Sequence, residues 1–263
     1  MSDRVTFEIG EDAVGVVTLN RPDKLNAMDR PLFEGLHDAA AQAGHAIEEG
    51  SVRAVLLRAE GRAFSAGLDV SLFSSQLGEA PDDEWIAYLQ QAITGLEDLR
   101  VPVVAAIQGP ALGGGCQLAL GAHLRLAAPD AQLALLEAAW AIIPDLGGLT
   151  RLPRLIGLSR ATDMAMTARK VGASEALSWG LVDRVLDEED FDAAARAFTA
   201  TLAAGPTLAI GAVPALLRQS FTTERDPMLA AERAYQQQCL ASVDFREAAQ
   251  AALQQRQPSF EGQ

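Results

Sequence analysis

Residues 101–122 of this chain, VPVVAAIQGPALGGGCQLALGA, decide its fold class. The stretch is apolar and close to the length of a membrane span, which takes roughly 20 residues. Two prolines, two glutamines and a cluster of four glycines between positions 109 and 115 interrupt it, and these are poorly suited to one continuous helix. We therefore divide it into a buried strand at Val101–Ile107, a glycine-rich turn, and a buried helix from about Gly114 to Gly121.

Strand-like and helix-like segments alternate on the N-terminal side of this stretch. Three short runs rich in β-branched and aliphatic residues predict strands: Val5–Ile9, Val14–Leu19 and Val52–Leu57. The first two are separated by Gly10-Glu11-Asp12, which predicts a hairpin. Amphipathic helical runs follow Asp29 and either Asp82 or Asp83, acids of the kind that cap helix N-termini. Strands that alternate with helices predict an α/β architecture.

The last third of the chain has a different pattern. From about Asp190 onward it is almost entirely helical in character, with breaks near Gly205-Pro206 and Asp226-Pro227. Each helix has one apolar face and little of its own region to pack against. We expect this region to dock on the main domain or on a neighbouring subunit, and we divide the chain into a core of residues 1–190 and a helical region of residues 191–263.

The composition argues against several classes of protein. Of the 263 residues, 49% are hydrophobic, enough for one large domain, and the net charge is −14. That charge argues against nucleic acid or an anionic membrane as a partner, since both bind basic surfaces. Cys116 and Cys239 lie near no second cysteine or histidine at metal-ligand spacing, so we expect neither a disulfide framework nor a metal site. The N-terminal residues 1–12 do not resemble a targeting peptide, which favours a cytoplasmic protein.

Two turns of small residues are placed to bind a ligand through backbone atoms. Phe64–Asp69 and Gly109–Gly115 each follow a predicted buried strand, and the second also opens a helix, whose first N–H groups are free. The glycine spacing matches neither a dinucleotide-binding motif nor a P-loop. Tight packing of a strand on a helix is the alternative explanation. If the turns meet, they place two N–H groups around one carbonyl oxygen, an oxyanion hole that contributes roughly 3–4 kcal/mol per donor.

Glu137 is the foremost candidate for proton transfer. It lies in the apolar run Leu135–Trp140, and burial among apolar side chains raises the pKa of a carboxyl group toward neutrality. A surface glutamate on an amphipathic segment is the alternative. Asp145 follows Pro144 and has the character of a turn residue. His123, just after the glycine-started helix, is expected to act as a cation at the C-terminal end of that helix.

Segments spread along nearly the whole chain resemble the crotonase (enoyl-CoA hydratase/isomerase) superfamily, with local similarity to dienoyl-CoA isomerases. In chain order they are Asn20–Met28, Ala63–Asp69, Gly109–Gln117, Ile143–Gly148, Arg151–Pro153, Thr167–Arg169, Ala173–Leu177, Gly180–Val182 and Gln255–Phe260. Each match alone is modest, and it is their shared order that makes the resemblance specific.

The resemblance implies a spiral of ββα units followed by a C-terminal helical trimerisation region, giving a homotrimer or hexamer. It also implies an acyl-CoA thioester as the ligand and no metal or redox cofactor. The thioester oxygen would accept hydrogen bonds from the backbone N–H groups of Leu68 and Gly114. The CoA moiety would lie along a further set of residues: Lys24, Leu25, Ala27, Ala66 and Asp69.

Two positions depart from the pattern that the resemblance implies. Hydratases of the family carry one glutamate just after the second glycine turn and another further along the chain. Here the second is present as Glu137, but the first is Gln117. An amide orients a water or a substrate but does not exchange a proton at neutral pH. Asp145 stands where dienoyl-CoA isomerases carry an aspartate, although those enzymes also carry an acid at the position of Gln117.

These residues favour proton transfer on an unsaturated acyl-CoA, with double-bond isomerisation ahead of hydration. Glu137 would move a proton between two carbons, with Asp145 as a second donor and Gln117 as an orienting group. Hydration of a 2-enoyl-CoA is the first alternative. A thioester hydrolase or decarboxylase on the same scaffold and a non-catalytic acyl-CoA-binding protein are the others. Leu72–Gln76 and Trp85–Leu89 would either line the acyl pocket or pack in the core.

Overall fold

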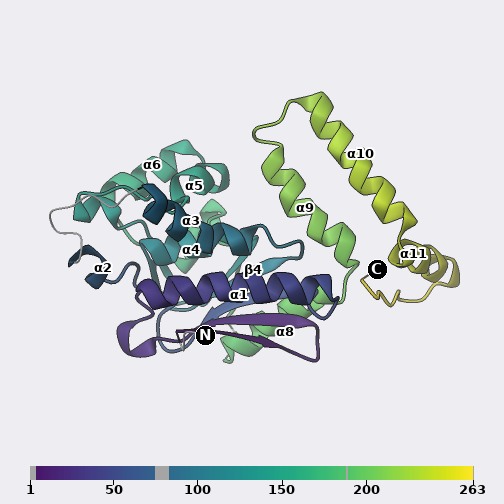
Figure 1. The fold of residues 1–263 in the computed structure, drawn as a ribbon, viewed down its shortest axis with the longest axis horizontal. Coiled ribbons are helices and arrows are strands. Elements are labelled where there is room, and N and C mark those ends of the chain that lie inside the picture. Colours follow the sequence, from purple (N-terminus) through teal and green to yellow (C-terminus); the bar gives the residue numbers. More distant parts are fainter. Residues whose placement is uncertain (1–3, 75–82, 188, 263) are drawn as a thin grey trace.

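Two sheets organise the computed structural model, which describes residues 4–74, 83–187 and 189–262 (Figure 1). The larger sheet has the spatial order β1 (Val5–Ile9), β2 (Val14–Leu19), β3 (Ala54–Ala59), β4 (Val103–Ile107), β6 (Leu124–Ala127) and β9 (Arg184–Val185). The smaller sheet consists of β5 (Pro110–Leu112), β7 (Gln132–Ala134) and β8 (Val171–Gly172). The predicted hairpin is confirmed, because β1 pairs antiparallel with β2, while the remaining pairs of the larger sheet are parallel.

The chain visits both sheets in turn. Strand β4 leads into β5 and then into helix α4 (Gly114–Gly121), whose bounds agree with the prediction. Strand β6 leads into β7 and then into a 3-10 turn, η2 (Glu137–Trp140). Since β5 and β7 are parallel neighbours, the two cycles stack on each other. The result is the α/β spiral of ββα units that the resemblance implied.

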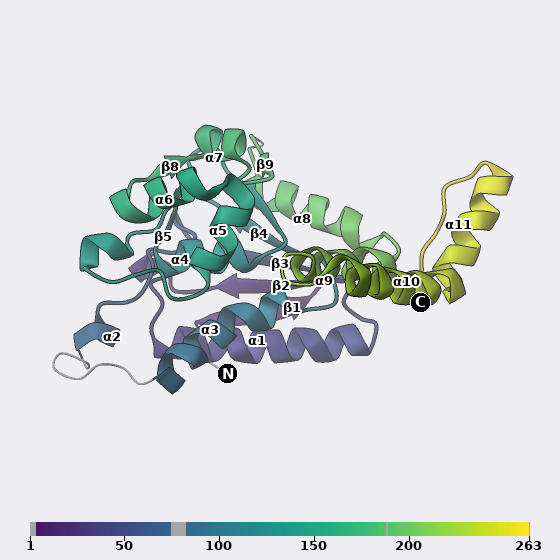
Figure 2. The ribbon, with the colours of Figure 1, turned by 90° about the horizontal axis from the view of Figure 1, so that it is seen from above.

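Strand β3 is buried on both faces, which explains its continuous apolar run. Its side chains alternate, so that Val55 and Leu57 join the core on the side of α1 (Arg30–Glu48), whereas Ala54 and Leu56 pack under α8 (Phe191–Ala203). Figure 2 shows the strands lying between α1 and α8. The larger sheet is thus the middle layer of the molecule.

The helix starts and strand bounds follow local chemistry. Asp29 caps α1 as predicted, and its Oδ1 accepts a hydrogen bond from the Leu32 N–H at 3.1 Å. Helix α3 begins at Asp83, and Asp82 lies outside the described residues. The predicted strand at residues 52–57 in fact begins at Ala54, because Val52 donates its N–H back to the Ala46 carbonyl at the end of α1. The other helical elements are η1 (Pro22–Lys24), α2 (Ser71–Ser74), α3 (Asp83–Glu97), α5 (Gly148–Ile156), α6 (Leu158–Thr167) and α7 (Ala173–Trp179).

The C-terminal helices form an arm that leaves the body of the molecule. Helix α8 packs on the sheet, and α9 (Thr207–Gln219) stays in contact with the body, where its Arg218 donates to Asp98 at 3.1 Å. Helices α10 (Arg225–Ala241) and α11 (Val243–Gln254) extend away from the body (Figure 1). Both predicted breaks are confirmed: one lies at Gly205-Pro206 between α8 and α9, and the other lies between α9 and α10, directly before Asp226-Pro227. Pro227 sits in the first turn of α10, where its missing N–H would have no partner anyway. Among the described residues, no single helix is both long enough and apolar enough to cross a membrane. Helices α8 and α9 reach that length and apolar character only when they are taken together, and the chain bends by 102° between them.

His123 does not act as a cation at the end of α4, so that prediction is wrong. Its Nδ1 accepts a hydrogen bond from the Val103 N–H at 3.0 Å, and its Nε2 lies 2.9 Å from the Glu97 carbonyl oxygen. Burial lowers the pKa of His123 to about 4. The ring is therefore neutral at pH 7, with its proton on Nε2.

Candidate active site

The two small-residue turns lie against each other. Ser65 and Ala111 form a parallel β-bridge, in which the Ser65 N–H donates to the Pro110 carbonyl (3.0 Å) and the Leu112 N–H donates to the Ser65 carbonyl (2.9 Å). Gly67 has a φ of +96°, and a Cβ atom there would lie 2.7 Å from the Leu112 carbonyl oxygen. Glycine at this position therefore allows the first turn to approach the second.

Leu68 in the first turn and Gly114 in the second each carry a backbone N–H group without a protein partner among the described residues. The Leu68 N–H lies beside the bridge between Leu68 and Met28, and the Gly114 N–H is the first of helix α4. Within residues 4–74, 83–187 and 189–262, neither group donates to another residue. A Cβ atom on Gly67 would lie 3.5 Å from the Gly114 nitrogen, so the two turns are in direct contact here. Two such donors can hold one carbonyl oxygen.

Leu68 and Gly114 line a cavity of about 550 Å³ together with Glu137. Of the residues that the resemblance places along CoA, those that also line this cavity are Lys24, Ala27, Ala66 and Asp69. Leu25 is not among the lining residues. Its carbonyl oxygen accepts a hydrogen bond from the Ala66 N–H at 2.8 Å, so it supports this wall from behind.

Glu137 is a buried carboxylate with one bound oxygen and one free oxygen. Its side chain lies at the start of η2, and the residue is 6% exposed. Oε1 accepts a hydrogen bond from Gln117 Nε2 at 2.7 Å, whereas Oε2 has no partner among the described residues. Burial raises the pKa of Glu137 above its usual value, the hydrogen bond from Gln117 opposes this, and the charge of Asp145 adds to it. A carboxylate in this state is suited to accept and return a proton.

Both polar atoms of the Gln117 amide are hydrogen-bonded to the protein. It is buried on α4, and its Oε1 accepts hydrogen bonds from the Leu146 and Gly148 N–H groups, both at 2.9 Å. Its Nε2 donates to Glu137. Gln117 is not among the residues that line the cavity, so the group that its amide orients is Glu137.

Asp145 lies near Glu137 but outside the cavity lining. Its carboxyl group is half-buried, and burial raises its pKa. Its charge is close enough to raise the pKa of Glu137. The charge of Asp145 therefore acts on Glu137, while the cavity itself is lined by Glu137 and not by Asp145.

Arg21 is a cavity residue that the sequence did not single out. Its Nη1 is 2.5 Å from Asp69 Oδ2 and 3.3 Å from Asp29 Oδ2, and it also donates to the Ala27 carbonyl. Hydrogen bonds from Ser71 and this arginine hold the pKa of Asp69 at about 2. Asp69 is thus a permanently charged group that fixes the wall and not a proton donor. The only signal for Arg21 in the sequence was its place in the segment Asn20–Met28, which resembles the family.

Apolar side chains complete the wall of the cavity. Val70, Leu136, Trp140 and Ile142 line it, and Trp140 is 62% exposed. By contrast, the segment Trp85–Leu89 packs on the main core, where the Trp85 and Tyr88 rings stack with centroids 5.5 Å apart. Leu72 also packs there, and Gln76 lies outside the described residues. No group of three or more His, Cys, Asp or Glu side chains in the described ranges is arranged to hold a metal ion.

Comparison with known proteins gives this site its context. The profile of the enoyl-CoA hydratase/isomerase family matches residues 10–263. The chain belongs to this family. A relative with that fold, the enoyl-CoA hydratase from Bacillus anthracis, has a solved structure that superposes with a TM-score of 0.89 at 30% identity, over 99% of this chain and 100% of that one. The predicted crotonase fold and family are therefore confirmed.

Two further members of the family have different names. The 1,2-epoxyphenylacetyl-CoA isomerase of Escherichia coli (strain K12) is 32% identical over 255 residues, which are 96% of each chain. The peroxisomal fatty acid beta-oxidation multifunctional protein AIM1 of Arabidopsis thaliana is 36% identical over 203 residues. Those residues are 76% of this chain but only 28% of the larger protein, so this chain spans less than a third of it.

Proposed function

We propose that this family member shifts the double bond of an unsaturated acyl-CoA thioester, with Glu137 as its acid–base group. One observation carries the proposal: a single raised-pKa carboxylate shares a cavity with two unpartnered backbone N–H groups. The relatives include proteins named as a hydratase and as an isomerase, so the choice between the reactions rests on the site.

In the proposed mechanism, the Leu68 and Gly114 N–H groups hold the thioester carbonyl oxygen. Loss of a proton from C2 of a 3-enoyl ester places negative charge on that oxygen, and each donor contributes roughly 3–4 kcal/mol to stabilising it. Glu137 accepts the proton on its free Oε2 and returns it to C4, which leaves the conjugated 2-enoyl ester. Protons and electrons stay within the substrate and Glu137, so the step needs no metal or redox cofactor.

Hydration of a 2-enoyl ester is the second candidate. It adds water across the double bond, and hydratases that this chain resembles use a second glutamate where Gln117 stands. Here the Gln117 amide is bound to Glu137 and to two backbone N–H groups, so no proton donor occupies that position. The other acid proposed as a proton donor is Asp145, whose charge acts on Glu137 but which does not line the cavity. These contacts favour isomerisation over hydration.

The remaining assignments follow the family. We assign Lys24, Leu25, Ala27, Ala66 and Asp69 to the CoA moiety. Lys24 is exposed and supplies local positive charge on a chain whose net charge is −14. We further propose a cytoplasmic homotrimer or hexamer without nucleic-acid or membrane partners. The oligomer is supported by the arm, which exposes large apolar side chains such as Leu253 (88% exposed) that a neighbouring subunit could cover.

The first experiment compares a 3-enoyl-CoA with a 2-enoyl-CoA, with chromatographic identification of the products. We expect the first to become the 2-enoyl ester, with no hydroxyacyl product from either. Glu137→Gln should abolish this conversion because the amide cannot accept the proton. The matched control is Glu48→Gln, the same change at an exposed glutamate of α1 that does not line the cavity, and it should retain the activity.

Other outcomes select a rival. A hydroxyacyl-CoA from the 2-enoyl ester would make hydration the reaction. Free CoA or carbon dioxide would indicate a thioester hydrolase or a decarboxylase on the same scaffold. Tight binding of both esters without turnover would indicate a non-catalytic acyl-CoA-binding protein. Activity unchanged in Glu137→Gln would remove Glu137 from the mechanism.

A further inference from the structure

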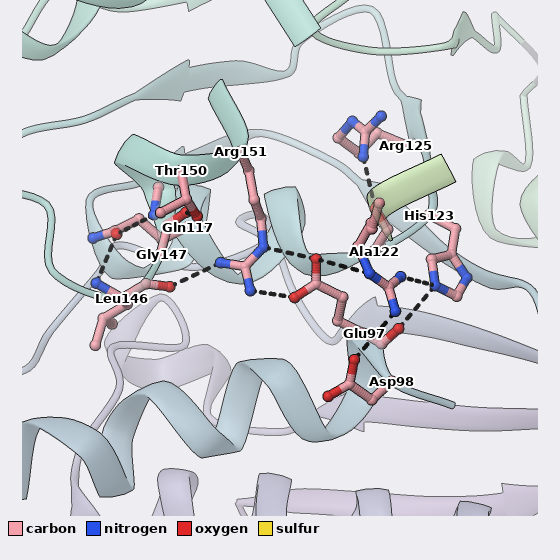
Figure 3. A network of polar contacts seen from close by, with 12 residues as sticks. Glu97, Asp98, Gln117, Ala122, His123, Arg125, Leu146, Gly147, Thr150 and Arg151 are labelled. Atoms are coloured by element: carbon pink, nitrogen blue, oxygen red, sulfur yellow. Dashed lines mark hydrogen bonds and ion pairs between the residues drawn. The ribbon is translucent and has the colours of Figure 1, made fainter. Parts of the chain in front are cut away.

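Gln117 lies at one end of a network of polar contacts that runs through Leu146 and Arg151 to Glu97 (Figure 3). We propose that Gln117, braced by the Leu146–Gly148 turn and by Arg151, is a positioning residue that holds Oε1 of Glu137 and leaves Oε2 as its proton-accepting atom. This inference rests on the proposed role of Glu137 and extends it to residues that touch no substrate.

The orientation of the Gln117 amide is set by its oxygen. Oε1 accepts two backbone N–H groups, from Leu146 and Gly148, at 2.9 Å each. A flipped amide would place its NH2 group against those two donors, so only one orientation satisfies them. In that orientation Nε2 donates one of its hydrogens to Glu137 Oε1, 2.7 Å away. The turn therefore decides which oxygen of Glu137 is occupied.

The turn itself is held from the other side by Arg151. The guanidinium donates from Nη1 to the Leu146 carbonyl at 3.1 Å, and its Nε and Nη2 form a two-point ion pair with the Glu97 carboxylate at the end of α3. Both side chains are largely buried, which strengthens this pairing relative to a surface ion pair. In Figure 3 the Arg151 side chain lies between Leu146 and Glu97, which it joins. Arg218 on α9 lies 3.9 Å from the same carboxylate and donates to Asp98 at 3.1 Å.

Three glycines make room for three members of this chain. A Cβ atom on Gly148 would lie 2.9–3.1 Å from Oε1, Cδ and Cγ of Gln117. A Cβ on Gly147, where φ is +87°, would overlap the Arg151 guanidinium, and a Cβ on Gly113 would lie 3.4 Å from Glu137 Oε1. The adjacent pair at 147 and 148 is thus fitted to the backs of two different polar side chains. A loop that merely closed the fold would not need both.

The other charged or titratable groups near Glu137 do not contact it directly. Asp145 precedes α5 and acts through its charge, and Cys116 on α4 is buried, which raises the pKa of its thiol and keeps it neutral. Arg21 is paired with Asp69, and Lys24 is exposed on the cavity wall. Among the described side chains, the one that hydrogen-bonds to Glu137 is Gln117. Displacing the Gln117 amide should therefore change both the protonation and the orientation of Glu137.

The test uses Gly148→Ala, with Gly172→Ala as the control. Alanine suits the start of α5, so the helix should form, while its methyl group pushes the Gln117 amide off its place. A Cβ on Gly172, far along the chain and without positive φ, meets nothing within 4 Å. We expect kcat to fall about 10- to 100-fold in Gly148→Ala, with KM changed less than about twofold, and no change in Gly172→Ala.

A second readout does not depend on turnover. The protonated carboxyl band of Glu137, assigned by its loss in Glu137→Gln, is titrated by infrared difference spectroscopy. Because the Gln117 hydrogen bond lowers the pKa of Glu137, its displacement in Gly148→Ala should move the titration to higher pH. Gln117→Glu keeps an oxygen for the two N–H groups but sets a second carboxylate against Glu137. This pair should titrate in two steps, the upper one above the wild-type midpoint.

The outcomes separate this inference from the proposed function. Wild-type kcat and an unshifted Glu137 titration in Gly148→Ala would overturn the positioning role, even if Glu137→Gln is inactive. A shifted titration with no isomerisation by the wild-type protein would retain the positioning role and reject the reaction. If Gly148→Ala does not fold, Arg151→Lys takes its place. It keeps a cation opposite Glu97 but loses the two-point pairing, and an unshifted titration there would equally overturn the proposal.

Discussion

The contact between the two turns gives the sharpest test of the proposed oxyanion hole. In Gly67→Ala, the new methyl group would lie 2.7 Å from the Leu112 carbonyl oxygen. That oxygen belongs to strand β5 of the smaller sheet and cannot rotate away as a side chain would. The turns must therefore separate, which moves the Leu68 N–H away from the Gly114 N–H. Loss of one such donor costs about 10²- to 10³-fold in kcat, so we expect a fall of at least 100-fold.

A matched variant isolates this effect from backbone strain. Alanine at a positive φ costs roughly 1–2 kcal/mol wherever it occurs. Gly50, after α1, has a φ of +78° and nothing within 4 Å of an added Cβ, so Gly50→Ala carries the strain without the contact. Both variants should lose stability in thermal unfolding, and Gly67→Ala alone should lose kcat/KM in the isomerisation assay. Equal activity losses in the two variants, or a fully active Gly67→Ala, would refute the oxyanion assignment.

Three further predictions concern stability. Burial raises the pKa of Glu137 in the folded protein above its usual value of 4.5. The stability that the protonated side chain contributes is therefore complete below pH 4.5 and is lost as the pH rises through the raised pKa. Glu137→Gln should increase Tm at pH 7, and this increase should disappear below pH 4.5. Burial lowers the pKa of His123 in the folded protein to about 4, whereas its usual pKa is 6.5. Between these two pH values the imidazole is protonated in the unfolded chain but not in the folded one. The free energy of unfolding should therefore fall as the pH drops from 6.5 to about 4. The loss should reach at most about 3 kcal/mol, and urea titrations of His123→Gln should lack it. In the interior of α1, Gly44→Ala would meet only Leu99 at 4.0 Å, and we expect a gain of about 0.5–1 kcal/mol in the same titration.

The fold was largely predictable because its signals are local. The capping carboxylate of Asp29 and the glycine start of α4 each act within a few residues, and each was placed correctly. Strand β4 ends at Ile107 as predicted but begins at Val103, two residues after the predicted start. The misplaced features had competing causes. Val52 is as apolar as a strand residue but closes the loop after α1 instead, and β4 begins only after Pro102, which has no N–H group to donate.

The candidate site was predictable only in part, because its decisive contacts join distant segments. The turns and Glu137 carried their own sequence signals. Whether Gln117 faced a substrate or a protein group depended on where Leu146 and Gly148 placed their N–H groups. The ion pair between Glu97 and Arg151 depends on how the end of α3 meets α5, which no local pattern encodes. Such pairings are a property of the tertiary fold.

The pocket that receives the Gln117 oxygen has a consequence for how this protein could evolve. Glutamine and glutamate codons differ in a single nucleotide. Two backbone N–H groups bind a carboxylate oxygen as readily as an amide oxygen, so the fold would accept glutamate at position 117 without rebuilding the turn. The only new conflict would be between that carboxylate and Glu137, and one shared proton resolves it. A lineage carrying this chain is thus one point mutation from a site with two carboxyl groups, and natural selection could cross between one-base and two-acid chemistry without passing through an unfolded intermediate.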